Sequence, residues 1–346
     1  MLLAGDIGGT KTDLAVFSVE GGPRRPLAQA EYRSSRYPSL EALVREFLAI
    51  NALPVTWACF DVAGPVIDGR AKVTNLPWQL DQVALADGLN LRVVHLLNDL
   101  EAVARAVPEL GPEDVVTLNT GERVAGGALA VIAPGTGLGE AFLIWDGVRY
   151  RAFPSEGGHA DFAPATALEL GLLSHLMTSY PHVSAERVCS GRGLVAIYEY
   201  LRASAAAPEA PEVARQLAGA EDHAPIISEA GLRDPPDPLS AATLATFAGI
   251  LGAEAGSLAL KVLATGGVYV AGGIPQHLLA VLRRGDFMGA FIRKGRLSEL
   301  MRRMPVHVVM RQAAIFGAAI RGLELGSDPE RPARGAPVPS GPAVSR

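Results

Sequence analysis

Hydrophobic residues occur along this chain in short runs that alternate with stretches of helical spacing. Residues 2–4 and 14–19 are apolar runs of strand length, and a glycine-rich turn separates them. Ser39 is a suitable N-cap for a helix that follows it, in which the apolar residues Leu40, Leu43, Val44, Phe47 and Leu48 share one face. This alternation of strands and helices predicts an α/β protein.

Two further strands are predicted at residues 55–60 and 93–97. The second is followed at once by apolar residues with the spacing of a helix that packs back on the sheet. Asn98 and Asp99 therefore lie at the carboxyl end of a strand. Open α/β sheets bind their ligands at that edge, so these two residues are candidates for a functional site.

The second half of the chain repeats the opening pattern. Residues 129–133 predict a strand, a glycine turn follows, and residues 141–145 predict a returning strand. Asp146-Gly147 is a hairpin signal before a strand at 148–153. Because the order strand, glycine turn, antiparallel strand occurs twice, we expect a duplicated domain.

The remaining segments complete this plan. Residues 203–240, rich in Ala, Pro, Glu and Asp, are interpreted as a variable excursion, and a long buried helix follows around Phe247 and Leu251. Strands are predicted at 268–271, which ends in Gly272-Gly273, and at 306–310, before a final amphipathic helix. Residues 327–346 are rich in proline and lack an aliphatic period, so we expect them to be disordered.

Composition and charge narrow the class of protein. The chain of 346 residues is long enough for two domains, and 49% hydrophobic with 19% charged residues is typical of a globular protein. The net charge of -5 and the scattered Lys and Arg residues argue against nucleic acid or an anionic membrane as the main partner. Two cysteines are too few for a disulfide framework. Without a signal peptide pattern or an uncharged apolar run of membrane length, we expect a cytoplasmic protein.

The two glycine turns are the first candidates for chemistry. Turns lined by Gly and Thr let backbone N–H groups approach a phosphate closely. Asp6 in the first turn would repel that phosphate unless a cation such as Mg²⁺, or its bound water, lies between them. Either turn alone is equally typical of a tight hairpin. Neither has the spacing or the following helix of a P-loop or a Rossmann fingerprint, so both of those motifs are excluded.

Asp99 has two interpretations. A carboxylate at a strand end can take the proton of a substrate hydroxyl as its oxygen attacks phosphorus. Asp is also a preferred helix N-cap, and a helix is expected to follow. The two roles are compatible.

A second polar cluster surrounds Gly157-Gly158. Glu156 and His159 lie three residues apart across these glycines, an arrangement that suits recognition of vicinal hydroxyls. A metal site is the weaker interpretation, because few potential ligands lie together. Glu186 by itself is ambiguous, because a glutamate in such a segment is usually a solvated helix charge.

Taken in order, these segments resemble the bacterial glucokinases of the hexokinase/actin-like ATPase superfamily, from Leu3 to about Leu325. Six motifs in register carry the resemblance: Gly5-Asp6-Ile7-Gly8-Gly9-Thr10, Leu97-Asn98-Asp99, Gly135-Thr136-Gly137-Leu138-Gly139, Glu156-Gly157-Gly158-His159-Ala160-Asp161-Phe162-Ala163-Pro164, Ser184-Ala185-Glu186-Arg187-Val188 and Ala271-Gly272-Gly273-Ile274.

The resemblance implies a role for each candidate residue. Asp99 matches the catalytic base for the 6-hydroxyl of glucose. The implied glucose-binding residues are Asn75, Asn98, Asp99, Glu156, His159 and Glu186. The implied ATP-binding residues are Asp6, Gly8, Gly9, Thr10, Gly135, Thr136, Gly137, Gly139, Gly272 and Gly273. Asp6 would hold Mg²⁺ through water or the nucleotide.

The resemblance also implies an architecture. It predicts two ribonuclease-H-like α/β domains with the active site in the cleft between them: a small domain of residues 1–109 with a C-terminal helix at 312–326, and a large domain of residues 110–311. Family members are commonly homodimers. The Cys-rich zinc motif of the related ROK sugar kinases is absent from the sequence, so no zinc site is expected. The carboxylate of Asp61 has no place in this assignment.

Several alternatives stay open. The acceptor sugar could equally be fructose, mannose or an N-acetylhexosamine, because loops that the sequence does not fold set the pocket. The phosphate donor could be another nucleoside triphosphate or polyphosphate. A non-catalytic sugar sensor is disfavoured because the first strand begins at Leu2 and leaves no room for a DNA-binding segment.

Overall fold

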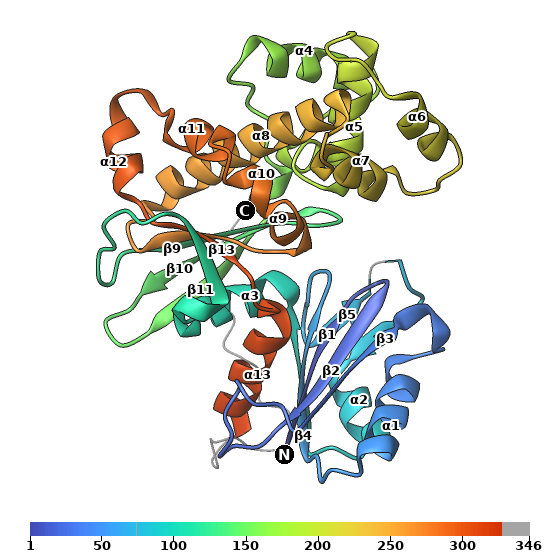
Figure 1. The fold of residues 1–346 in the computed structure, drawn as a ribbon. Coiled ribbons are helices and arrows are strands. Elements are labelled where there is room, and N and C mark those ends of the chain that lie inside the picture. Colours follow the sequence, from blue (N-terminus) through green and yellow to red (C-terminus); the bar gives the residue numbers. More distant parts are fainter. Residues whose placement is uncertain (74, 327–346) are drawn as a thin grey trace. The chain divides into compact units, whose positions relative to one another are not determined.

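A computed structural model describes residues 1–73 and 75–326. The expectation of disorder at 327–346 concerns residues outside this range. The chain divides into two compact units, one made of Met1–Ala106 and the segment from Gln312, the other of Val107–Arg311. Each unit is built on its own sheet (Figure 1).

The first unit contains a five-stranded sheet with the order β3-β2-β1-β4-β7. Strand β2 is antiparallel to β1 and β3, whereas β1, β4 and β7 are parallel. The strands are β1 (Leu2–Ile7), β2 (Lys11–Phe17), β3 (Ala28–Arg33), β4 (Trp57–Val62) and β7 (Val93–Asn98), with β5 (Arg70–Lys72) and β6 (Gln79–Asp81) forming a separate pair. The helices are α1 (Leu40–Asn51), α2 (Gln82–Leu89), α3 (Asp99–Ala106) and α13 (Ala313–Gly326).

Side chains alternate along the strands of this sheet and pack into two hydrophobic cores, one on each face. Leu3, Ile7 and Phe60 pack with apolar residues of α1 and α2 on one face. Leu2, Ala4 and other residues of the opposite parity pack against α3 and α13 (Figure 1). The α13 helix thus brings the end of the described chain back onto the first sheet. As predicted, Ser39 caps α1, and its Oγ accepts from the N–H of Ala42 at 3.3 Å.

The second unit has the six-stranded order β11-β10-β9-β12-β13-β8. Its strands are β8 (Val115–Asn119), β9 (Leu129–Pro134), β10 (Leu138–Trp145), β11 (Tyr150–Ser155), β12 (Gly267–Val270) and β13 (Val306–Val309). Leaving out the edge strand β8, the order and directions match those of the first sheet. The duplicated strand, glycine turn, antiparallel strand pattern that the sequence predicts is therefore confirmed.

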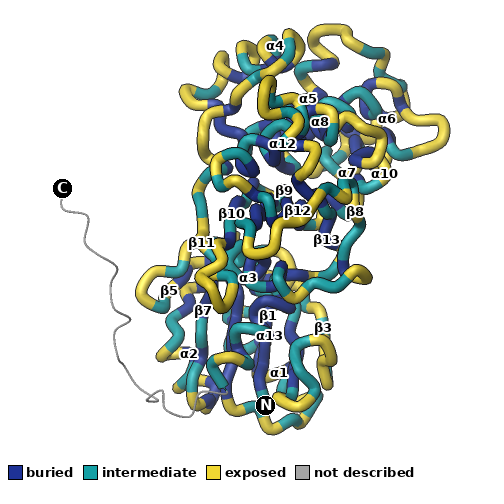
Figure 2. Tube along the Cα trace, turned by 90° about the vertical axis from the view of Figure 1, so that its left-hand side faces the viewer, coloured by how far each residue is buried: buried dark blue, intermediate teal, exposed yellow. Residues whose placement is uncertain are grey.

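Helices of the second unit pack together on one core with residues of β9, β12 and β13. They are α4 (Ala167–Leu176), α5 (Gly191–Ala203), α6 (Pro211–Ala218), α7 (His223–Leu232), α8 (Pro238–Val262), α9 (Gly273–His277), α10 (Leu279–Leu282), α11 (Asp286–Ile292) and α12 (Ser298–Arg303). Figure 2 shows the central strands of both sheets, such as β1 and β9, as largely buried and α6 with its loops as largely exposed.

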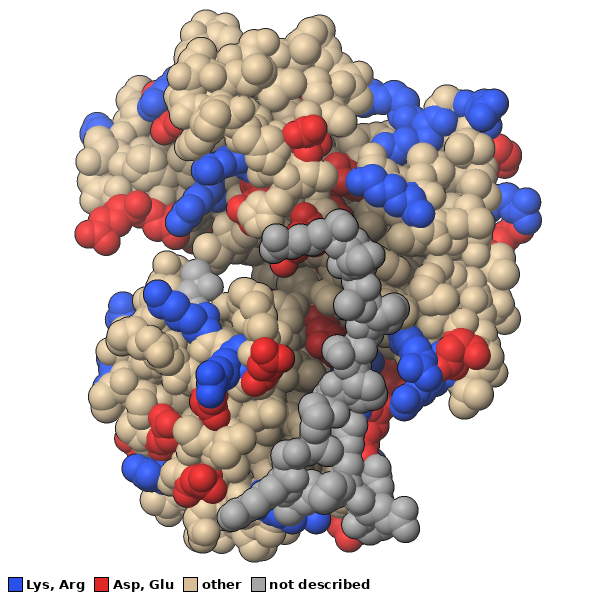
Figure 3. All heavy atoms as spheres, turned by 180° about the vertical axis from the view of Figure 1, so that it is seen from behind, with Lys and Arg blue, Asp and Glu red and all other residues tan. Residues whose placement is uncertain are grey.

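Among the described helices, α8 is the one that is long and apolar enough to cross a membrane by length and composition. Of its most apolar window, 61% is buried inside the protein, where Phe247 and Leu251 are fully covered. Such burial is typical of a core helix, and the sequence predicted a long buried helix here. On the face shown in Figure 3, acidic and basic side chains are interspersed rather than gathered by sign.

Candidate functional site

The first glycine turn connects β1 and β2, and hydrogen bonds from side-chain hydroxyl groups stabilise it. The N–H of Gly8 donates to the carbonyl of Lys11 at 2.9 Å, and the Oγ of Ser34 donates to the carbonyl of Gly8 at 2.8 Å. The buried Thr12 hydroxyl lies 2.9 Å from that of Ser34. A Cβ at Gly8 would lie 2.7 Å from the Lys11 carbonyl oxygen, so this close turn requires glycine. Thr10 is exposed at its tip.

Carboxylates lie in one row across the carboxyl edge of the first sheet. Asp6 is in register with Asp61 on β4 and with Asp13 on β2, so all three side chains point to the same face. Asp61 is fully buried, and as an ionised carboxylate it has no hydrogen-bond donor for either oxygen among the residues that the structure describes. Its carboxyl lies close enough to that of Asp6 for a hydrogen bond once one of the two carries a proton.

Burial sets the protonation of this row. It raises the pKa of Asp6 to about 6, against the lowering effect of the hydrogen bond with Asp61. Burial also raises the pKa of Asp61 well above its usual range, and the charges of Asp6 and Asp99 act in the same direction. One proton shared between Asp6 and Asp61 therefore relieves their repulsion.

The exposure of each carboxylate in this row decides which of them can hold the Mg²⁺ ion that the resemblance implies. Asp6 is partly exposed and offers hard oxygen donors, whereas Asp61 is completely covered. The described residues contain no group of three or more His, Cys, Asp or Glu that could hold a metal ion by themselves. Asp6 alone therefore fits a cation that takes its other ligands from water and phosphate, as Mg²⁺ commonly does.

Asn98 and Asp99 lie where β7 ends and α3 begins. The Oδ1 of Asn98 accepts from the N–H groups of Leu100 and Glu101 at 2.9 and 3.2 Å, so Asn98 is the residue whose side chain caps α3. Asp99 is the first residue of the helix, and its Oδ1 accepts from Leu100 at 2.8 Å. The N-cap of α3 is therefore Asn98 and not Asp99. The Nδ2 of Asn98 also donates to the Gly64 carbonyl.

Asn75 lies on the exposed loop between β5 and β6. Its φ of 64° is in the left-handed region, which Asn tolerates better than most residues. The loop holds its side chain at the surface of the first unit.

The second glycine turn connects β9 and β10. The N–H of Gly135 donates to the Gly137 carbonyl at 2.8 Å, and Thr136 is exposed at the tip. The Oε2 of Glu186 accepts from the N–H of Leu138 at 3.0 Å. A Cβ at Gly137 would lie 2.5 Å from the same oxygen. Glu186, predicted as a sugar ligand, therefore contacts the predicted phosphate turn directly.

A β-bridge places Glu186 near the Glu156–His159 turn. Residues Asp161 and Ser184 form the bridge, and the N–H of Ala185 donates to the Ala160 carbonyl at 2.9 Å. The turn itself is a short 3-10 helix, Gly157–His159, in which the side chains of Glu156 and His159 are exposed. The structure thus brings together three of the predicted sugar ligands, which are separated by up to 30 positions, within the second unit.

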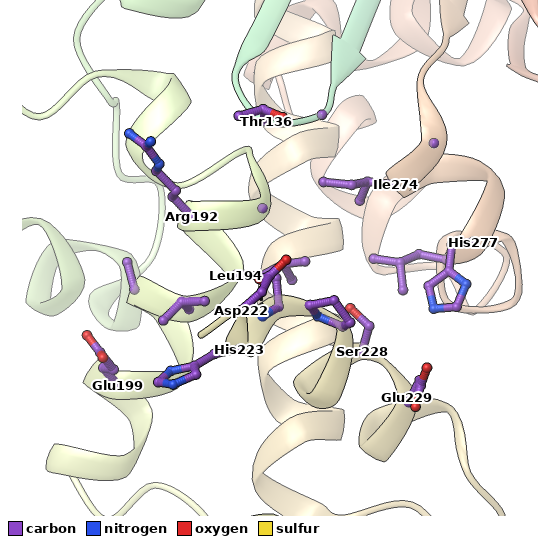
Figure 4. Close-up of a pocket in the computed structure, with 18 of the residues that line it drawn as sticks. Thr136, Arg192, Leu194, Glu199, Asp222, His223, Ser228, Glu229, Ile274 and His277 are labelled. Atoms are coloured by element: carbon purple, nitrogen blue, oxygen red, sulfur yellow. Dashed lines mark hydrogen bonds between the residues drawn. The ribbon is translucent and has the colours of Figure 1, made fainter. Parts of the chain in front are cut away.

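A cavity of about 850 Å³ opens beside the second glycine turn (Figure 4). Gly135, Thr136 and Gly273 contribute to its wall. Gly272 adopts a φ of 93°, and a Cβ there would lie 2.7 Å from the Pro134 carbonyl oxygen. This predicted glycine therefore allows the end of β12 to approach the end of β9.

Sequence reasoning missed much of the cavity wall. Arg192 at the start of α5 lines it, together with residues of the 221–229 segment, among them Asp222, His223 and Ser228 (Figure 4). The segment 203–240, which was interpreted as a variable excursion, contains α6 and α7, and its residues between 221 and 229 line the cavity. No pattern in the segment signals that role.

Together, the two units define a class of protein. Each has a sheet of the same topology with a glycine turn after its first strand, and the second turn borders a ligand-sized cavity. Two such units are typical of the actin-like sugar kinases.

Comparison with known proteins gives the family. The profile of the Glucokinase family matches residues 3–324. A glucokinase of Trichormus variabilis is 42% identical over 94% of this chain and 99% of its own, and one of Yersinia enterocolitica is 35% identical over 91% and 94%. The crystal structure of a glucokinase from an Antarctic psychrotroph has a TM-score of 0.77 at 28% identity and covers 93% of this chain and 98% of that one. The chain belongs to the glucokinase family and is a hexose kinase, which confirms the resemblance inferred from the motifs.

Proposed function

We propose that this chain transfers the γ-phosphoryl group of MgATP to the 6-hydroxyl of glucose. The observation that carries the proposal is the pair of Gly/Thr turns on sheets of matching topology, with the Asn98-Asp99 strand end beside the first and the sugar-type cluster beside the second. Family membership supports the same reaction. Phosphoryl transfer proceeds mainly through positioning and charge stabilisation, which this arrangement of donors supplies.

Asp99 is the residue proposed to act as the base. Asp99 is the first residue of α3, at the carboxyl end of β7, and the side chain that caps this helix is that of Asn98. The Asp99 carboxylate would orient the glucose 6-hydroxyl and accept its proton as the oxygen attacks phosphorus. Asn98 retains one amide hydrogen for the sugar after its bond to Gly64.

The remaining sugar ligands have distinct proposed roles. Glu156 accepts hydrogen bonds from sugar hydroxyls, and His159 donates or accepts according to its tautomer. Glu186 joins the sugar cluster to the phosphate turn through its bond to Leu138. Asn75 borders the sugar from its loop.

The nucleotide is proposed to bind through both glycine turns. Gly8, Gly9 and Thr10 hold phosphate oxygens from the first unit, and Gly135 to Gly139 hold them from the second. The 850 Å³ cavity beside Gly273 has room for the nucleoside part. When bound, Mg²⁺ neutralises phosphate charge, and Asp6 would hold it directly or through water.

Architecture, assembly and location complete the proposal. We propose a small domain of residues 1–109 with 312–326, a large domain of 110–311, and one reaction that uses residues of both. The division into two compact units supports this scheme. We also propose that the chain forms a cytoplasmic homodimer, as the resemblance to the bacterial glucokinases implies.

The test compares Asp99→Ala and Asp99→Asn with the wild type. Loss of the base should lower kcat by about 10²–10⁴-fold in both variants. The affinity for ATP, measured by calorimetry, should stay unchanged. A kcat near the wild-type value in both variants would contradict the assignment of Asp99.

The sugar ligands are tested separately. Glu156→Gln and His159→Ala should raise the glucose KM strongly while the KM for ATP stays constant. An unchanged glucose KM in both variants would remove these residues from the sugar site.

A further inference from the structure

Glu140 is a buried carboxyl that no role described above uses. It lies on β10, opposite Ile132 of β9 and Ser155 of β11. Its side chain is 1% exposed, and its Oε1 has no hydrogen-bond partner in the described part of the protein. A buried polar atom without a partner is costly, so its retention calls for an explanation.

The other oxygen of Glu140 lies directly beneath the sugar turn. A Cβ added to Gly157 would be 2.0 Å from Oε2 of Glu140, so the carboxyl fills the space that glycine leaves. The N–H of Gly157 is fixed by the Oγ of Ser155 at 3.0 Å. Glu140 is also two residues from Leu138, whose N–H binds Glu186. The carboxyl is therefore in contact with the turn that carries Glu156 and His159, and close to the phosphate turn.

The surroundings of Glu140 favour its uncharged form. Burial raises its pKa to about 7, and the negative charge of Glu254 on α8 adds to that effect, while Lys261 on the same helix opposes it. Burial raises the pKa of the Cys189 thiol well above its usual range, and the charges of Glu254 and Glu140 add to that effect. Lys261 is thus the cation whose charge acts on Glu140, and its effect is smaller than those of burial and Glu254.

We propose that Glu140 is a positioning residue for glucose binding, whose uncharged carboxyl supports the Gly157 backbone and so sets the orientation of Glu156 and His159. This inference rests on the proposed function of that turn. An ionised Glu140 in the same place would need water or a shift of its neighbours. Glycine at 157 has no side chain to resist such a shift, so the sugar ligands would move with it.

The proposal predicts a pH effect confined to the sugar. Above pH 7 the fraction of uncharged Glu140 falls about tenfold per pH unit, and the glucose KM of the wild type should rise in parallel. The KM for ATP should not follow it. Glu140→Gln keeps the shape and the neutral state, so its glucose KM should equal that of the wild type at pH 6 and stay constant to pH 8.5.

Two further variants sharpen the test. Glu140→Ala removes the support, so its glucose KM should be raised about tenfold or more at every pH while kcat changes little. Glu254→Gln removes a like charge, so Glu140 should ionise more readily and the rise in KM should begin at lower pH. Glu169→Gln is the matched control: Glu169 is also buried in this unit, but its carboxyl accepts from Ala165, and its profile should match the wild type.

The possible results distinguish a failure of the role of Glu140 from a failure of the proposed function on which that role rests. A wild type that phosphorylates no sugar would overturn the proposed function. A wild type that phosphorylates glucose with a KM that Glu140→Gln and Glu140→Ala leave unchanged at all pH values would overturn the role of Glu140. A lower kcat, together with glucose and ATP KM values that both rise by a similar factor at every pH, would show that Glu140 has a general structural role. That result would also overturn the proposal.

Discussion

Replacement of Asp61 by Asn should stabilise the protein at neutral pH. Asp61 is fully covered and in register with Asp6, and unless it shares a proton with Asp6 neither of its oxygens has a hydrogen-bond partner among the described residues. Burial raises its pKa well above the ordinary value of 3.8, so the folded protein binds a proton that the unfolded chain releases. An Asn amide is neutral without that proton and can donate to Asp6 in its place.

The direction and the size of the change in the free energy of unfolding follow from the difference in the pKa of Asp61 between the folded and unfolded states. A carboxyl with a raised folded pKa contributes full stability below pH 3.8, and this contribution is lost as the pH rises. The cost is about 1.4 kcal/mol for each pH unit over which the folded protein still holds a proton that the unfolded chain has released. The Asn variant avoids this cost. The two proteins should therefore have similar free energies of unfolding near pH 4 and diverge steadily above it.

Urea unfolding between pH 4 and 8, in buffer with EDTA to exclude divalent cations, measures this divergence. Asp81→Asn is the control with the opposite sign, because Asp81 caps α2 and hydrogen bonds from Ala84, Arg70 and Val83 lower its pKa. That variant should be less stable than the wild type, by an amount that is constant from pH 5 to 8. A constant or shrinking difference between Asp61→Asn and the wild type would refute the reasoning.

Two predictions concern the packing of the second unit. In Gly158→Ala the new Cβ would lie 2.1 Å from the carbonyl oxygen of Leu138, so the turn must move and the glucose KM should rise about tenfold or more; steady-state kinetics with an unchanged KM would contradict this. In Ser190→Ala the cap of α5 is lost, since Oγ accepts from Gly193 at 3.2 Å and donates to the Glu186 carbonyl at 2.8 Å. Urea unfolding should show a loss of about 1 kcal/mol, and an unchanged free energy of unfolding would show that the cap contributes nothing.

The sequence predicted the parts of the fold that follow from local patterns. The apolar strands β1, β4, β7 and β9 lie within a few residues of their predicted positions, and the Asp146-Gly147 turn is confirmed by the side chain of Asp146, which accepts from the N–H groups of Val148 and Arg149. Strand β3 was not predicted. Its residues alternate between half-buried and exposed at a sheet edge, and that pattern is too polar for a strand signal.

The candidate site was predicted in part. The motifs identified exposed residues such as Glu156 and His159, because glycines around them mark a tight turn. The burial of Asp61 and Glu140 could not be predicted, since it depends on neighbours that are distant along the chain. The capping of α3 by Asn98 instead of Asp99 depends on a shift of one residue, which is within the usual uncertainty of a helix end.

A coupled kinase assay with MgATP against glucose, mannose, fructose, galactose and N-acetylglucosamine tests the central claim most directly. The account predicts turnover of glucose well above that of the other four sugars, and loss of that turnover in Asp99→Ala. Faster turnover of another sugar would contradict the glucose assignment while keeping the phosphoryl-transfer mechanism. No turnover of any of the five would contradict the claim that this chain is a glucokinase.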